Sequence, residues 1–186
     1  ADMARWMGYG KSFQDFKINV HISGKAGTAG ARRAWSRLSP TARSCITFEN
    51  EEITHGLDRC LELADIVPTV LDVHHHWIKT GEYISPTDDR VRRVVDSWRG
   101  VRPALHYSVS REDCLVDHVS NIKPDLSALL AQGYKKQKLR AHSDFMWNVA
   151  VNEWAMTFAD QWDIQVEAKG KNLARDQLYQ QWLFSR

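Results

Sequence analysis

The chain has 186 residues, of which 43% are hydrophobic and 26% charged, a balance typical of a folded globular domain rather than a disordered chain. No apolar run approaches the ~20 residues of a membrane span, and no N-terminal stretch has the pattern of a signal peptide, so we expect a cytoplasmic protein. The 25 basic and 23 acidic residues give a net charge of +2, which excludes a strong overall attraction to polyanions.

Five short apolar runs alternate along the chain with amphipathic stretches. The runs are rich in β-branched residues, as buried strands of a parallel sheet are, and they cover residues 16–23, 45–50, 69–76, 103–108 and 163–169. The amphipathic stretches have helical spacing and fall at about 28–38, 53–66, 86–99, 142–160 and 170–183. Alternation of this kind predicts a parallel α/β fold.

One irregular segment, roughly residues 109–141, separates the fourth predicted strand from the helix predicted for 142–160. A short helix is expected within it, at about 125–132. The segment also contains a run of four basic residues within six positions, namely Lys135, Lys136, Lys138 and Arg140. Such a run is either a solvated loop or, if it lies beside the functional face, a contact for a nucleic-acid backbone.

Every predicted strand ends in side chains that can bind a metal ion. These are His21, Glu49, Asp72 with His74 to His76, His106 and Glu167, and His142 stands at the start of the helix predicted for 142–160. Because the carboxyl ends of parallel strands lie on one face, residues far apart in sequence converge there. A single such residue is usually structural, but burying several together without a cation costs several kcal/mol per unpaired ion. The pattern therefore predicts a metal cluster with nitrogen and oxygen ligands, which suits Zn, Mn or Fe.

The end of the third predicted strand leaves two arrangements open. Strict alternation along a strand pairs Asp72 with His74 on one face. If the strand ends at about Val73, the chain turns and His75 lies beside Asp72 instead. Spacing alone does not decide between them. We expect His76 to donate to a partner of a ligand or to face solvent.

The three cysteines give a different kind of information. Cys45, Cys60 and Cys114 are odd in number and widely spaced, without the paired spacing of a thiolate metal site. We therefore expect reduced, mostly buried thiols, as in a cytosolic protein.

Several of these segments together resemble the UV damage endonuclease family. They are residues 20–25, 48–50, 71–76, 105–108, 142–144 and 166–171, and they occur in the family's order within roughly residues 16–175. The Asp-x-His-His-His and Glu-Ala-Lys-x-Lys segments are the most specific. The resemblance implies a TIM-type (β/α) barrel, related to the class II abasic-site endonucleases and the xylose isomerases.

The resemblance also implies a chemistry. Carried over position by position, the expected metal ligands are His21, Glu49, Asp72, His75, His106, His142 and Glu167, which favours His75 over His74. The family holds a manganese cluster, with Zn or Mg as alternatives here, and nicks damaged double-stranded DNA immediately 5′ of a UV photoproduct. Glu49 and Glu167 would bridge ions as catalytic carboxylates. Lys169 and Lys171, just beyond the last strand, would either bind phosphate during hydrolysis or be solvated surface residues.

Two departures from the family pattern stand out. Where the family has a lysine two residues before the histidine of the fourth strand, this chain has Ala104. A (βα)₈ barrel also takes about 250 residues, and this sequence predicts only five βα units. We therefore expect residues 1–186 to be the C-terminal part of a single barrel domain that is incomplete at its N-terminus, to be completed by a missing N-terminal segment or a second chain.

Two other functions fit parts of the sequence. A sugar isomerase or epimerase also uses acids and histidines around a divalent metal at a barrel mouth, but the Asp-x-His-His-His segment and the basic run weigh against it. A non-catalytic barrel fragment that binds metal or DNA is favoured by the missing strands and by Ala104. Metal-dependent turnover of aldoses would support the first alternative, and tight DNA binding without cleavage the second.

Overall fold

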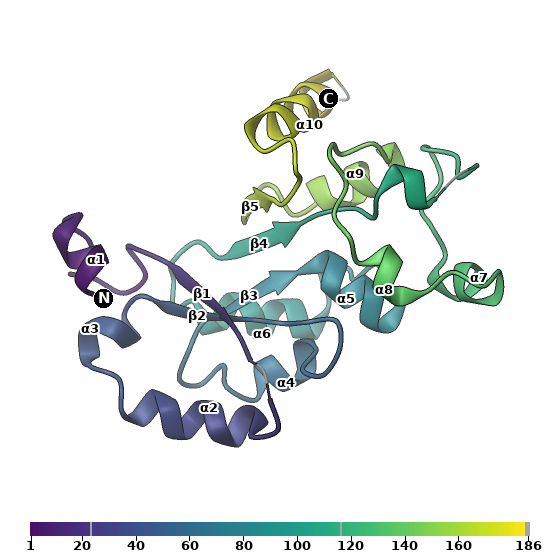
Figure 1. Cartoon of the computed structure of the whole chain (residues 1–186). Coiled ribbons are helices and arrows are strands. Elements are labelled where there is room, and N and C mark those ends of the chain that lie inside the picture. Colours follow the sequence, from purple (N-terminus) through teal and green to yellow (C-terminus); the bar gives the residue numbers. More distant parts are fainter. Residues whose placement is uncertain (23, 116, 185–186) are drawn as a thin grey trace. The chain divides into compact units, whose positions relative to one another are not determined.

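The structure is a computed structural model that describes residues 1–22, 24–115 and 117–184, and the chain forms two compact units (Figure 1). Unit 1 comprises Ala1–Leu71 and Thr87–Pro103, and unit 2 comprises Asp72–Pro86 and Ala104–Arg186. Ser23 of the first predicted strand and Val116 of the predicted irregular segment lie outside the described residues. The single domain expected from the sequence stays a prediction.

Unit 1 is built on parallel strands in chain order. Strand β1 (Ile18–His21) pairs with β2 (Ile46–Glu49), and β2 pairs with β3 (Thr69–Asp72). The helices of this unit are α1 (Asp2–Trp6), α2 (Gly27–Ser36), α3 (Pro40–Arg43), α4 (Leu57–Leu61) and α6 (Asp89–Ser97). Its core includes Trp35 against Phe48, with Cys60 packed beside them.

Unit 2 contains the parallel pair β4 (Ala104–Tyr107) and β5 (Asp163–Val166). Its helices are α5 (Val73–Thr80), a 3₁₀ turn (Glu112–Cys114), α7 (Leu126–Ala131), α8 (Lys136–Leu139), α9 (Val149–Met156) and α10 (Asn172–Phe184). A second cluster of buried apolar side chains, with Trp77, Leu115 and Leu139 among them, joins α5 to the long segment after β4. Apolar burial therefore anchors that segment even where it has little regular structure.

The predicted α/β class and the parallel pairing of strands are confirmed, and of the two arrangements left open at the end of the third strand the structure has the one in which the chain turns. The third strand ends at Asp72, and α5 begins at the next residue because the Asp72 side chain caps it, accepting a 2.6 Å hydrogen bond from the His75 amide. A short apolar run cannot distinguish a buried strand from the first turn of a buried helix.

The helix predicted for 142–160 begins only at Val149, with Asn148 as its cap. Residues 141–143 instead pair with residues 109–111: the Ser143 amide donates to Val109 O at 3.0 Å, and the Arg111 amide donates to Ala141 O at 3.1 Å. Backbone groups used in this pairing are not available to a helix. His142 is therefore held by an extended segment and not by a helix N-terminus.

The remaining helices follow the prediction with shorter limits. The helix expected for 53–66 is reduced to Leu57–Leu61 after Gly56, and the short helix expected at about 125–132 is α7. Among the described residues, no helix combines the length and apolar character that would let it cross a bilayer.

Candidate metal centre

Unit 2 brings together five of the seven ligands predicted from the sequence. They come from the end of β3, the first turn of α5, β4, the extended segment 141–143 and the residue that follows β5, and they are Asp72, His75, His106, His142 and Glu167. All five are side chains with nitrogen or oxygen donors, as hard and borderline divalent cations require.

Glu167 lies between two imidazoles. One of its oxygens is 3.2 Å from His106 Nδ1, and the other is 3.9 Å from His142 Nδ1. Two atoms that each bind one ion at about 2.1 Å, with tetrahedral or octahedral angles, lie roughly 3.0–3.4 Å apart. The His106–Glu167 pair therefore already has the spacing of two ligands of one ion.

The chain of contacts continues on the other side of His142. The ring centres of His142 and His75 are 6.4 Å apart, and His75 Nδ1 lies 3.5 Å from Asp72 Oδ2. The pairing of Asp72 with His75 follows from the helix start, because a cap residue and the third residue after it lie on the same side of the first turn. The five donors thus form two sets of close contacts, Asp72 with His75 and Glu167 with two imidazoles, and the rings of His75 and His142 link the two sets.

Exposure rises steadily across this group. The Asp72 side chain is inaccessible and that of His106 is 8% exposed, whereas His142 and Glu167 are 30% and 35% exposed. A buried carboxylate beside a buried imidazole is costly unless charge compensates it, and a divalent cation supplies that compensation. The open side would leave room for water and a substrate. The donor set therefore fits a divalent metal ion.

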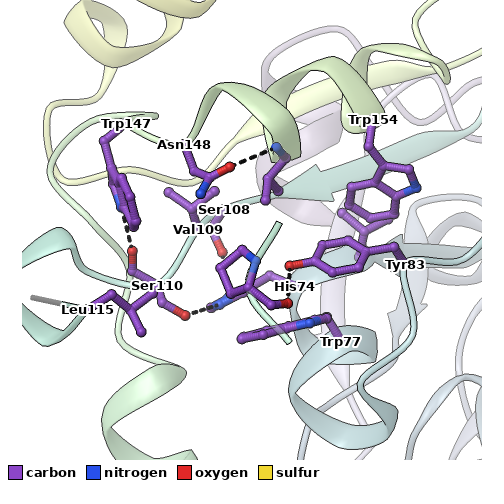
Figure 2. A pocket seen from close by; sticks show the side chains of 13 residues that line it. His74, Trp77, Tyr83, Ser108, Val109, Ser110, Leu115, Trp147, Asn148 and Trp154 are labelled. Carbon is purple, nitrogen blue, oxygen red and sulfur yellow. Dashed lines mark hydrogen bonds between the residues drawn. The ribbon is translucent and has the colours of Figure 1, made fainter. Parts of the chain in front are cut away.

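His74 has a different environment from His75. It is buried, its Nδ1 is 2.9 Å from Ser108 Oγ, and its Nε2 is 3.2 Å from Ser110 Oγ (Figure 2). Burial, and then the nearby His142 and His75, lower the pKa of His74 to about 3, so the ring is neutral at physiological pH. With both nitrogens engaged, His74 is unsuited to be a ligand, which supports His75 in that role.

The serine partners of His74 are residues that the sequence reasoning missed. Ser108 and Ser110 follow His106 at spacings of two and four residues, so an extended chain would place all three side chains on one side. This two-residue spacing in the sequence could have indicated that the two serines lie on the same side as His106. His76, the third histidine of the run, is buried with its Nε2 3.0 Å from Glu82 Oε2, and so does not face solvent.

Unit 1 contains the other two predicted ligands. His21 and Glu49 are partners in the β1–β2 register, and His21 Nε2 is 3.6 Å from Glu49 Oε2. Glu49 is 2% exposed and also accepts a hydrogen bond from Asn19, whereas the His21 side chain is 49% exposed. The role of these two residues as ligands stays a prediction.

The basic residues singled out in the sequence all lie in unit 2. Lys136 and Lys138 belong to α8, which Lys135 and Arg140 flank, and the run ends two residues before His142. Lys136 Nζ donates to Lys79 O at 3.0 Å. Lys169, two residues beyond Glu167, lies 3.5 Å from Asp144 and is half exposed. These cations are therefore close in sequence to His142 and Glu167, on segments of the same unit.

Comparison with known proteins adds two findings. The sequence matches the model of the UV-endonuclease UvdE family over residues 3–183. The fold is similar to the crystal structure of SacUVDE, with a TM-score of 0.62 and 21% identity over 93% of this chain and 51% of that one. The chain thus spans about half the length of that protein. No curated protein matches the sequence.

Proposed function

Because the chain belongs to the UV-endonuclease UvdE family, we propose that it takes part in DNA repair as a metal-dependent endonuclease that nicks the backbone on the 5′ side of UV photoproducts. The observation that carries the proposal is the group of five donor side chains in unit 2, in which Glu167 lies within 4 Å of two imidazoles. A mixed set of imidazoles and carboxylates suits Mn²⁺, with Zn²⁺ or Mg²⁺ as alternatives.

The metal would be held by Asp72, His75, His106, His142 and Glu167, with His21 and Glu49 as further ligands expected from the family resemblance. When bound, the metal would lower the pKa of a bound water and stabilise charge on a phosphoryl oxygen, as phosphodiester hydrolysis requires. Asp72 and His106 are the buried members of the group, so their positions are fixed by packing.

The exposed side chains of unit 2 would contact the substrate and take part in proton transfer. Glu167 is 35% exposed and would accept a proton from the attacking water. Lys169 would bind a phosphate of the substrate in exchange for its exposed contact with Asp144. The basic run from Lys135 to Arg140 would bind the DNA backbone independently of sequence.

The proposal is tested by nicking of supercoiled plasmid, with and without UV irradiation, in Mn²⁺ or in EDTA. We expect conversion to open circles only for irradiated plasmid in Mn²⁺, and loss of conversion in Glu167→Gln. Lys25→Gln, an exposed charge change in unit 1, is the matched control and should behave as the wild type.

Equal nicking of unirradiated plasmid, or no nicking with Mn²⁺ bound, would overturn the proposal. Tight Mn²⁺-dependent binding of damaged DNA without any nicking would instead support a non-catalytic fragment. Ala104, buried in β4 where the family has a lysine, is the residue that makes this alternative specific.

A further inference from the structure

His74 lies beside the metal-ligand candidates of unit 2 but is itself unsuited to bind a metal. We infer that His74 is a positioning residue, whose hydrogen bonds to Ser108 and Ser110 fix the segments that carry His75, His106 and His142 relative to one another. The inference concerns how the proposed metal centre is held in shape, and so it rests on the proposed function for its purpose but not for its geometry.

The directions of the hydrogen bonds between His74 and the two serines follow from the backbone carbonyl of Leu139, at one end of the network. Leu139 O can only accept, so the Ser110 hydroxyl donates its one hydrogen to it, at 2.6 Å. Ser110 Oγ must then accept from His74 Nε2–H, at 3.2 Å. The unprotonated Nδ1 of His74 accepts in turn from the Ser108 hydroxyl, at 2.9 Å. Each donor is used once, which fixes one tautomer of His74.

The three ends of this network lead directly to metal-ligand candidates. His74 itself is adjacent to His75 in the first turn of α5. Ser108 follows His106 by two residues at the end of β4, and Ser110 forms a β-bridge with His142. One imidazole therefore connects three separate segments of unit 2.

Ring contacts hold the imidazole in this orientation. His74 stacks on Trp77 with ring centres 5.9 Å apart and planes at 14°, and the His142 ring meets it edge-on at 5.8 Å (Figure 2 shows His74 and Trp77). His74 and Trp77 are 5% and 3% exposed, so water does not compete for these bonds. The ring is thus a rigid support for the His142 side chain.

The test compares two buried histidines of the same helix. His74→Leu removes the network, whereas His76→Leu removes a buried histidine whose Nε2 lies 3.0 Å from Glu82. We expect His74→Leu to weaken Mn²⁺ binding by about 10- to 100-fold, as loss of a residue that orients metal ligands does. His76→Leu should leave Mn²⁺ affinity unchanged, even if both variants melt at lower temperature.

Three further variants separate positioning from general destabilisation. His74→Gln, which retains one donor and one acceptor, should recover part of the affinity. Ser108→Ala should weaken binding in the wild-type background but add nothing to His74→Leu, because the two residues act through one bond. Equal effects of His74→Leu and His76→Leu, or full additivity, would overturn the inference.

A metal-free readout keeps the inference independent of the proposed function. In the apo protein, His74→Leu should speed hydrogen exchange of the Ser143 and Arg111 amides, which bond to Val109 O and Ala141 O. His76→Leu should not. If exchange is unchanged in His74→Leu, the inference fails. If exchange rises but the wild type nicks no DNA, the positioning role stands and the proposed nuclease activity fails.

Discussion

Unit 1 and unit 2 both end parallel strands in histidines and carboxylates, but they assemble these side chains to different extents. In unit 1, His21 and Glu49 form a pair, and Asn19 donates a hydrogen bond to the buried carboxylate. In unit 2, Asp72 pairs with His75, and Glu167 lies within 4 Å of His106 and His142. The difference comes from two segments beyond the strands: residues 141–143 bring in His142, and the chain after β5 brings in Glu167. Strand ends therefore supply some of the candidate ligands of unit 2, and the segments beyond the strands supply the others.

The largest expected effect is on the nicking rate, which should fall further when a carboxylate of unit 2 is replaced than when one of unit 1 is. Glu167→Gln should slow nicking of irradiated plasmid by roughly 10³-fold, because it removes both a ligand and a proton acceptor. Glu49→Gln should slow it by only about 10-fold, because the Glu49 carboxylate already has a protein donor in Asn19. Single-turnover nicking rates in saturating Mn²⁺ measure both. Equal losses would mean that unit 1 contributes as much as unit 2.

Removal of metal should lower the free energy of unfolding, because the ion would be bound by the donor side chains of unit 2. At a free Mn²⁺ concentration 100 times the Kd, binding to the native state adds about 2.7 kcal/mol to the free energy of unfolding. Thermal melts with Mn²⁺ and with EDTA should therefore differ for the wild type and coincide for Glu167→Gln. A Mn²⁺-dependent melting temperature in that variant would place the stabilising ion elsewhere.

Removal of basic residues should weaken DNA binding when the residues belong to the basic run of unit 2, but not when they belong to unit 1. Replacement of the exposed Lys135 and Lys138 by Gln should reduce the slope of log K against log salt by up to roughly 1.8, or about 0.9 for each lost phosphate contact. Lys25→Gln with Arg37→Gln removes the same charge from exposed positions of unit 1 and should leave the slope unchanged. Fluorescence anisotropy across a salt series measures both variants. Equal slopes in the two variants would argue against a DNA contact at the basic run.

The smallest effect concerns the thiols. Burial raises the pKa of Cys60 to about 12 and also raises that of Cys45, both in unit 1, whereas Cys114 in unit 2 is half-buried. At pH 8, a thiol reagent should modify Cys114 first and reach the other two on unfolding.

The raised pKa of Cys60 also sets a pH dependence. Between about 9 and about 12 the unfolded chain loses the thiol proton while the native chain keeps it, so the free energy of unfolding should fall with rising pH in this window. Cys60→Ala should flatten the decline. Rapid modification of Cys60 in the native protein would contradict its burial.

Much of the fold was predictable because apolar runs and helical spacing report burial directly. The strand ends His21, Glu49 and His106 were found in this way, and so was the unusual density of ligands. Two features were not predictable from local sequence. The end of β3 depends on a cap by the Asp72 side chain. The position of His142 depends on backbone pairing with residues more than thirty positions earlier in the chain. Both features lie at the candidate metal centre, where local preference and tertiary contacts disagree.

Metal binding by unit 2 is the central property to measure. Mn²⁺ titration of the protein, followed by the electron paramagnetic resonance signal of free Mn²⁺, measures this without DNA. We expect tight binding by the wild type, its loss in the double variant His106→Gln with Glu167→Gln, and wild-type binding in His55→Gln, a unit 1 histidine that contacts Gly24 O. Absence of binding by the wild type, or full binding by the double variant, would contradict the assignment of the metal centre.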